Sequence, residues 1–271
     1  MRRLFPIFLT TLLLCACHKS TFVIEGTLDN GGNKTIYIEE IIPNEAPLFI
    51  DSVRLDANGH FTFRYKPPYE TFYNIHVSAD DYVVLLPKTG ERIKLTGDFT
   101  RFETTYMVEG SPESTLLWQL QDYSNMGGER LREIVAIDKQ NRERCALAKQ
   151  PKTAANGASP VIDTVAYKKL KKVTDSIFLD AFSEQQSYVT EFITRNRGSL
   201  STLIALYKPF NNHPIINPED NFDYYEYVAD GLEEMIPDNP HTKHFRNTVE
   251  YLRHRVPKKE AADFDINIAA Q

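Results

Sequence analysis

Short segments in which hydrophobic and polar residues alternate fill the chain from residue 21 to about residue 110. Phe22 and Ile24 share one face of the first segment, and Phe61 and Phe63 share one face of a later one. Alternation with period two is typical of strands with one buried face. Further strands are expected at 34–42, 48–55, 60–66, 72–77, 82–86, 92–96 and 106–108, separated by turn-forming Gly, Asn and Pro. Eight strands at this spacing predict an antiparallel β-sandwich or a small barrel.

A helical pattern replaces the alternation after Gly110. Ser111 can cap a helix, and Pro112 suits its first position because the fixed φ and missing N–H of proline are tolerated there. The pair Gly127-Gly128 is expected to interrupt this helix. Further helices are expected at 129–149, 162–195, 199–208, 217–235 and 241–255, with an exposed loop at 151–160. The predicted fold class is α+β: an antiparallel β-sandwich or barrel-like domain, then an all-helical domain.

The N-terminus has the pattern of a secretory signal. Arg2 and Arg3 precede an apolar run at 4–14, which is too short to span a bilayer as a helix. The formal net charge of the chain is −6, and loss of both arginines with the signal makes it −8. Nucleic acid is therefore excluded as a non-specific partner, because such binding relies on Lys and Arg that neutralise phosphates.

The sequence Leu14-Cys15-Ala16-Cys17 ends the apolar run and resembles the bacterial lipobox. The resemblance implies that the signal is cut after Ala16 and that the sulfur of Cys17 receives a diacylglyceryl group. Cys15 stands where a small residue is usual. The alternative is an ordinary signal peptide with free release of the protein.

Cys145 is the only thiol expected in the mature chain, because Cys15 leaves with the signal and Cys17 becomes a thioether. No internal disulfide is then possible. Arg142 and Lys149 are spaced to flank Cys145 on a helix, and nearby positive charge favours a reactive thiolate. The interpretation that we favour is a half-buried small apolar residue, since there is no resolving cysteine.

Two other groups of side chains have a chemical and a structural interpretation. His241 and His244, near His254, could share a helix face, but a metal site needs further ligands, so solvated histidines are favoured and no metal or cofactor is predicted. A dense aromatic group could recognise sugar or peptide, but packing of an amphipathic helix is favoured. Its members are Phe222, Tyr224, Tyr225 and Tyr227.

The acidic pairs Asp80-Asp81 and Glu39-Glu40 do not predict catalysis. Neighbours in a strand point to opposite faces, so neither pair forms a general acid–base couple by itself. The sequence contains no nucleophile elbow, P-loop or dinucleotide fingerprint. We therefore lean against an enzyme.

Several features together resemble one protein family. They are Gly26, the pair Asp51-Ser52, the Gly59 turn before Phe61-x-Phe63, the junction Val108-Glu109-Gly110-Ser111, and Phe192-Ile193-x-x-Asn196 before the segment 199–206. They are similar to the uncharacterised β-rich N-terminal domain, and the helical segment after it, of Bacteroidetes-type envelope lipoproteins that carry a thioredoxin-like module.

The resemblance does not extend to that module. At the usual entry to it, the chain has Ala261-Ala262-Asp263-Phe264, with Ala262 where proline is usual, and ends at Gln271. The thioredoxin-like module and its Cys-x-x-Cys pair are therefore expected to be absent, and their redox activity is not carried over.

Lipidation of Cys17 would place the protein in the cell envelope, held by acyl chains that bind stably when two or more insert. No acidic cluster of the kind linked to surface export follows Cys17, so we expect the outer membrane with the protein facing the periplasm.

The expected organisation is a signal peptide (1–16), a lipidated tether (17–20), a β-sandwich-like domain (21–110), a helical domain (111–256) and a flexible C-terminal tail (257–271). The tail has too little apolar area to offset its ordering entropy, although its alternation would suit pairing with a partner's sheet edge.

The functional hypothesis is a membrane-anchored lipoprotein that acts as a non-enzymatic interaction or ligand-binding module. The expected partners are the membrane, through the acyl chains on Cys17, and another protein of the envelope, and the class of ligand stays open at this point. The alternative is an accessory component of periplasmic thiol–disulfide traffic that docks a separate thioredoxin-like partner or acts through Cys145.

Overall fold

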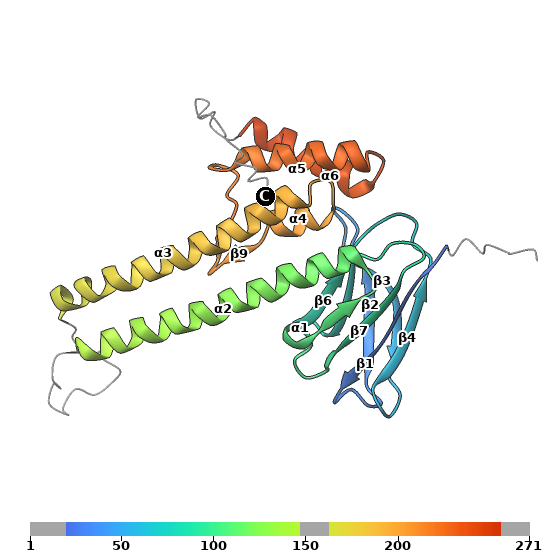
Figure 1. The fold of residues 1–271 in the computed structure, drawn as a ribbon, viewed down its shortest axis with the longest axis horizontal. Helices are drawn as coiled ribbons and strands as arrows, with labels where there is room; N and C mark the ends of the chain where they lie inside the picture. The colour runs from blue at the N-terminus through green and yellow to red at the C-terminus, as the bar shows by residue number, and fades with distance from the viewer. Residues whose placement is uncertain (1–19, 147–162, 256–271) are drawn as a thin grey trace, which may run out of the picture.

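The structure is a computed structural model that describes residues 20–146 and 163–255 (Figure 1). Strands are followed by helices, so the predicted α+β class is confirmed. The signal sequence with Ala16, the lipid-attachment residue Cys17, the predicted loop at 151–160 and the tail at 257–271 lie outside the described residues.

Eight strands form two four-stranded sheets that face each other as a sandwich. The strands are β1 (Phe22–Asp29), β2 (Thr35–Glu40), β3 (Leu48–Arg54), β4 (His60–Tyr65), β5 (Tyr73–Ser78), β6 (Asp81–Leu85), β7 (Arg92–Asp98) and β8 (Met107–Glu109). The first sheet has the order β4-β1-β7-β8 and the second sheet the order β3-β2-β5-β6.

The prediction of a wholly antiparallel sandwich is wrong for one pair of strands. β1 and β7 run parallel, with Val23 opposite Arg92 and Gly26 opposite Leu95. β7 returns to the first sheet only after the chain has built the second sheet, and it then runs in the direction of β1. Hydrophobic alternation indicates which face of a strand is buried but not its direction, so the sequence could not reveal this pairing.

Side chains from both sheets fill the space between them. Ile24 and Ile93 from the first sheet and Ile36, Ile38 and Ile75 from the second are at most 1% exposed. Burial of one such side chain contributes about 1.5–3 kcal/mol. The sandwich therefore has an apolar core of its own.

The short helix α1 (Phe102–Thr105) lies between β7 and β8, and its Phe102 belongs to the core of the sandwich, whereas the helices from α2 onward follow the sandwich and pack around a second core. These later helices are α2 (Pro112–Arg144), α3 (Thr164–Arg195), α4 (Ser201–Leu206), α5 (Phe222–Met235) and α6 (Pro240–Arg253), with the short strands β9 (Pro209–Phe210) and β10 (His213–Pro214) after α4. α2 and α3 lie side by side and extend away from the sandwich, while α4, α5 and α6 gather near it (Figure 1). The Ser111 hydroxyl accepts a hydrogen bond from the Ser114 N–H at 3.3 Å, which confirms the predicted start of α2.

The prediction that Gly127-Gly128 interrupts the helix is wrong, because α2 continues past both residues. Gly127 is buried where α2 faces α3, and a Cβ there would lie 2.5 Å from Nε2 of Gln185. At Gly128 a Cβ would meet nothing nearer than Nη1 of Arg132, at 3.9 Å. Gly127 thus allows the two helices to approach closely.

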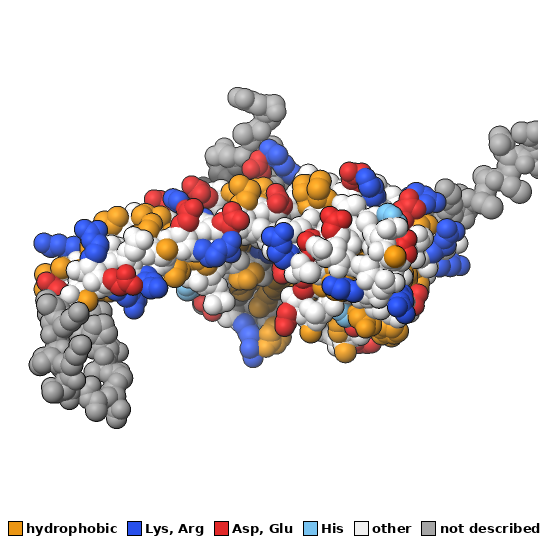
Figure 2. All heavy atoms as spheres, turned by 90° about the horizontal axis from the view of Figure 1, so that it is seen from below, with side chains coloured by type: hydrophobic (Ala, Val, Ile, Leu, Met, Phe, Trp, Pro, Cys, Tyr) orange, Lys and Arg blue, Asp and Glu red, His pale blue; other side chains and the backbone are white. Residues whose placement is uncertain are grey.

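Charged side chains of both signs are interspersed over the long helices on the face shown in Figure 2. Pairs such as Arg142–Asp138 at 2.9 Å and Lys171–Asp175 at 2.5 Å lie on single helices. Water and salt screen exposed pairs of this kind, so they contribute little to the stability of the fold. No helix in the described part of the chain has both the length and the apolar character that a membrane span requires.

The sandwich and the helices meet in shared apolar packing. Phe72, just before β5, and Leu86, just after β6, belong to the core of the helices rather than to that of the sandwich. The Leu86 N–H also donates to Oγ of Ser114 at 3.1 Å. The second sheet is therefore fixed to the first turn of α2.

We expect Gly128→Ala to raise the free energy of unfolding by about 0.5–1 kcal/mol, because alanine is favoured over glycine inside a helix and the position is open. Gly127→Leu should lower it by about 1–3 kcal/mol, because the new side chain would enter the packed surface between α2 and α3. Urea unfolding followed by circular dichroism measures both changes. Equal effects of the two substitutions would contradict the role given to Gly127.

Candidate functional site

His241 lies at the junction between the helices and the sandwich. Asn239 caps α6 by accepting a hydrogen bond from the His241 backbone N–H at 2.9 Å. His241 is 6% exposed, and its Nε2 lies 2.8 Å from Oγ1 of Thr71. The rings of Phe72 and His241 lie edge-on, with their centroids 5.1 Å apart. Burial lowers the pKa of His241 to about 4, so the ring is neutral at pH 7. The expectation of a solvated histidine is therefore wrong here.

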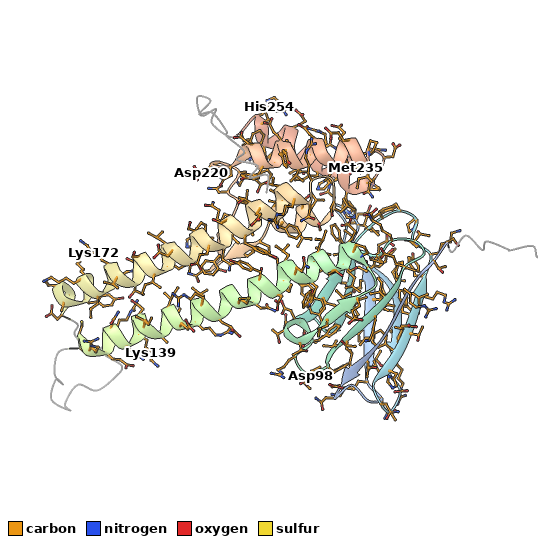
Figure 3. The ribbon with its side chains drawn as sticks, viewed as in Figure 1. Asp98, Lys139, Lys172, Asp220, Met235 and His254 are labelled. Carbon is orange, nitrogen blue, oxygen red and sulfur yellow. The ribbon has the colours of Figure 1, made fainter. Side chains whose placement is uncertain are left out.

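The other two histidines of this region lie apart from His241. Nδ1 of His244 lies 2.9 Å from Nδ2 of Asn44, in a second polar contact between α6 and the sandwich. His254 directly follows the last residue of α6, at the side remote from the sandwich (Figure 3). In the described part of the chain, no three His, Cys, Asp or Glu side chains are grouped so that they could hold a metal ion.

Cys145 follows the last residue of α2 and is 7% exposed. Its carbonyl oxygen accepts a hydrogen bond from the Asp163 N–H at 2.8 Å, which joins the end of α2 to the start of α3. Nε of Arg142 binds Oδ2 of Asp138 at 2.9 Å, so this cation is engaged by a carboxylate. A thiol this buried is poorly accessible to an oxidant or a partner. Lys149 lies outside the described residues.

The acidic pairs are used separately. Glu40 is 3% exposed; burial raises the pKa of its carboxyl, and hydrogen bonds from Tyr69 and Tyr65 act against that rise. Its neighbour Glu39 points to the outward side of the second sheet. Asp81 accepts hydrogen bonds from the N–H groups of the first two residues of α1, at 3.0 and 2.6 Å. The buried carboxylate and the capping carboxylate thus have structural roles.

Lys208 is a half-buried cation that the sequence patterns did not indicate. Burial lowers the pKa of its amine, and Nζ donates a hydrogen bond to Oε1 of Gln121 at 2.6 Å. Nε2 of Gln121 donates in turn to Glu103 at 3.3 Å. Lys208 therefore ties the segment after α4 to α2 and α1.

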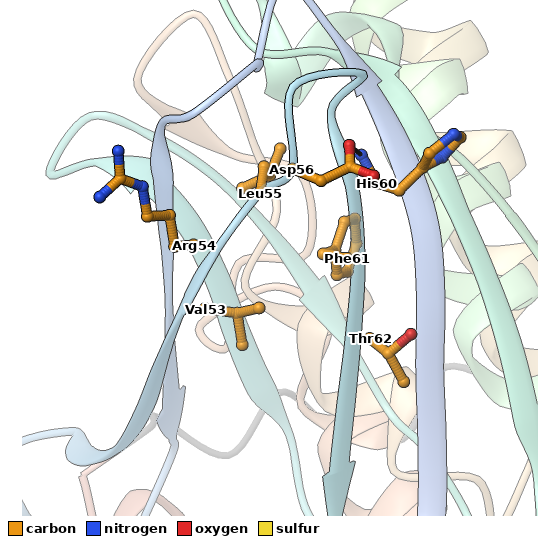
Figure 4. Close-up of a pocket in the computed structure, with 7 residues that line it drawn as sticks. All are labelled: Val53, Arg54, Leu55, Asp56, His60, Phe61 and Thr62. Atoms are coloured by element: carbon orange, nitrogen blue, oxygen red, sulfur yellow. Dashed lines mark hydrogen bonds between the residues drawn. The ribbon is translucent and has the colours of Figure 1, made fainter.

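An open hollow of about 470 Å³ lies between β3 and β4, where the two sheets separate (Figure 4). Its lining residues are Val53, Arg54, Leu55, Asp56, His60, Phe61 and Thr62. Asp56 accepts hydrogen bonds from the N–H groups of Asn58 and His60, and the bond from His60 is the main reason for its lowered pKa. Nδ1 of His60 lies 2.7 Å from Oγ1 of Thr27. These polar groups are already engaged in hydrogen bonds in and beside the turn. We therefore interpret the hollow as the open edge of the sandwich core, and not as a ligand site.

The outward side of the second sheet carries a group of exposed aromatic side chains. Tyr37 from β2, His76 from β5 and Tyr82 from β6 lie opposite one another across neighbouring strands. Phe49 from β3 lies opposite Glu39 of β2. Tyr37, Phe49 and Tyr82 are 39%, 57% and 43% exposed. We call these five residues the aromatic face.

The centre of the aromatic face is ordered by side-chain contacts. The rings of Tyr37 and His76 stack with centroids 5.3 Å apart and planes inclined by 25°. Oε1 of Glu39 lies 3.6 Å from Nε2 of His76. Within residues 20–146 and 163–255, the hydroxyls of Tyr37 and Tyr82 have no hydrogen-bond partner. Open rings, a carboxylate and available hydroxyls can contact a ligand that has both apolar and polar groups.

The aromatic group at the start of α5 is mostly packed against the helices. Tyr225 is 2% exposed, and its hydroxyl donates to the carbonyl oxygen of Ile216 at 3.1 Å. Phe222, Tyr224 and Tyr227 are partly buried against the same core. The packing interpretation is thus supported over a recognition surface.

One comparison with known proteins gives a match. Residues 22–117 match the family model described as Domain of unknown function (DUF4369). The match runs from the start of β1 into the first turns of α2, so it contains the whole sandwich. It is consistent with the predicted resemblance to an uncharacterised β-rich N-terminal domain. No curated protein matches the chain.

We expect the stability of the protein to fall between about pH 6.5 and pH 4 in a way that depends on His241. The folded ring has a pKa of about 4, whereas the ring in the unfolded chain has its ordinary value of about 6.5. The unfolded chain therefore binds a proton that the folded chain does not. This difference lowers the free energy of unfolding by about 1–3 kcal/mol near pH 4.

The measurement is urea unfolding at several pH values for the wild-type protein and for His241→Gln, which keeps a polar group near Thr71. The loss of stability between pH 6.5 and pH 4 should be smaller in the variant by that amount. The same pH dependence in both proteins would refute the role of the buried ring.

Proposed function

We propose that the protein is a lipid-anchored envelope protein that acts as a non-enzymatic binding module. Acyl chains on Cys17 hold it in the outer membrane with the sandwich facing the periplasm. The sequence Leu14-Cys15-Ala16-Cys17, behind a basic and then apolar N-terminus, supports the anchor. Two or more acyl chains bind a bilayer stably.

The aromatic face is the single observation that carries the binding function. Large aromatic side chains are normally buried or packed, and a group of them exposed on one rigid surface indicates a contact site. Tyr37 and Phe49 are held by neighbouring strands of a sheet, so their rings are positioned before any ligand arrives. The site needs no movement of a loop.

The titratable groups that could suggest catalysis have other roles. Glu40 is buried beside tyrosines, Asp81 caps α1, and His241 in the first turn of α6 packs against Thr71 of the sandwich domain. The buried position of Cys145 gives no support to the thiol-redox alternative. These roles favour a binding module over an enzyme.

The anchor is tested by Cys17→Ala, with Cys145→Ala as the matched control. We expect Cys17→Ala to abolish metabolic labelling by palmitate and to remove the mature protein from the membrane fraction. Cys145→Ala should keep both, because its thiol is buried in the folded protein. Labelling that persists in Cys17→Ala would overturn the anchor.

The contact surface is tested by placing a photoreactive benzoylphenylalanine at one position at a time in living cells. We expect light-dependent adducts when it replaces Phe49 or Tyr82 on the aromatic face. Tyr251, which is 54% exposed on α6, is the control position and should give none. Equal adducts at all three positions, or none at any, would contradict the aromatic face as the contact surface.

A further inference from the structure

One side of the Tyr37 ring is open for stacking. His76 covers the ring on the side of β5, with the ring centroids 5.3 Å apart. On the side of β3 the cross-strand neighbour of Tyr37 is Ser52, whose small side chain cannot cover the ring. Phe49 stands on the same strand beyond Ser52, on the same side of the sheet. A ring-shaped ligand resting over Ser52 would thus have aromatic groups beside it.

Polar groups surround this open position. Glu39 supplies a carboxylate that is 29% exposed, and Ser52 and Tyr37 supply hydroxyls without a partner among the described residues. Carboxylates accept hydrogen bonds, whereas hydroxyls both donate and accept them. The surface can therefore bind a ligand that carries several hydroxyl groups around an apolar face.

One acidic and one basic side chain flank the open position on the outward side of the sheet. Glu39 is negative, and Arg54 lies two residues along β3 from Ser52 on the same side of the strand. Arg54 is exposed and points away from Val53, which faces the hollow (Figure 4). A cation held by the rings would be repelled by Arg54, and an anion by Glu39. An uncharged ligand fits best.

The size of the surface favours a small ligand over a protein. The exposed parts of Tyr37, Phe49 and Tyr82 amount to roughly 300 Å², if a fully exposed aromatic side chain presents about 200 Å². A stable protein interface needs about 800 Å² on each partner. A second copy of this chain or a folded partner would therefore need contacts well outside the aromatic face.

From these observations we infer that the aromatic face binds a neutral oligosaccharide. One sugar ring stacks its apolar C–H face on Tyr37 over Ser52, and its hydroxyls bind Glu39 and Ser52. Phe49 and Tyr82 contact the neighbouring sugar units on either side. This inference rests on the proposed binding function and names the class of its ligand.

The test uses the mature chain with Cys17→Ser, so that acyl chains do not interfere. Isothermal titration and amide chemical shifts are measured with cellohexaose, maltohexaose and chitohexaose, and with pentalysine as a cationic probe. We expect saturable binding of at least one hexasaccharide, with shifts on β2, β3, β5 and β6. Tyr37→Ala should weaken it about tenfold, and Glu39→Gln about threefold. Tyr251→Ala should leave it unchanged.

The variants are compared only if their thermal unfolding matches that of the parent. If Tyr37→Ala is unstable, two single variants replace it: Tyr37→Ser, which keeps a hydroxyl, and Glu39→Gln, which keeps the size of the side chain. Any one of three results would overturn the inference that the ligand is a neutral oligosaccharide. They are the absence of binding to every hexasaccharide, binding by Tyr37→Ala that equals that of the parent, and preferential binding of pentalysine. Photo-adducts at Phe49 together with no sugar binding would overturn the ligand class alone. Absence of both would overturn the proposed function as well.

Discussion

The position of the helices on the second sheet is the constraint on which the exposed surface depends. Val84 of β6 and Leu86 just after it pack against the core of the helices. Tyr82, two residues before Val84 on the same side of the strand, is 43% exposed. The helices therefore cover one end of the outward side and leave the other end open. The sandwich does not need that open end for stability, because its inward side forms a complete core.

Polar contacts fix this arrangement more closely than apolar packing could. Nδ2 of Asn239 donates to the Glu70 carbonyl oxygen at 2.7 Å, and His241 meets Thr71 directly beside it. Lys88 lies 3.5 Å from Glu70 and 3.1 Å from Glu113 of α2. Apolar surfaces can slide against each other, whereas buried hydrogen bonds have a preferred geometry. The helices are thus held at a defined place on the sheet, and the border of the aromatic face is defined with them.

Much of the fold could be predicted from local patterns, because local patterns report which side of an element is buried. The alternation around Ile36 and Ile38 correctly places Tyr37 and Glu39 on the outward side. What it cannot report is which strands become neighbours. Tyr37 and His76 are 39 positions apart, and their stacking depends on the register between β2 and β5. The alternation therefore places Tyr37 and Glu39 on the outward side, but it does not show that residues of four strands form one face there.

The same limit applies where one residue type has two physical uses. Glycine inside a helix normally signals a break, yet in α2 the glycine at 127 allows close contact with Gln185 of α3, and only the packed structure separates the two cases. Adjacent acids gave a similar ambiguity, since Glu40 is buried and Glu39 is partly exposed within one strand. Sequence reasoning predicted that they point to opposite sides, but not that one side would be covered by tyrosines.

The residues that carry the family resemblance are mainly those that shape the sandwich. A Cβ on Gly26 would lie 1.7 Å from the Leu95 carbonyl oxygen, so this position allows β1 and β7 to pair. Phe61 and Phe63 fill the core, and Ser111 starts α2. Such residues specify a scaffold, and a scaffold can support different functions. The match over residues 22–117 therefore accounts for the sandwich, while the function has to be argued from exposed side chains that the scaffold does not require. Tyr37, Phe49 and Glu39 are of that kind, because the core is complete without them.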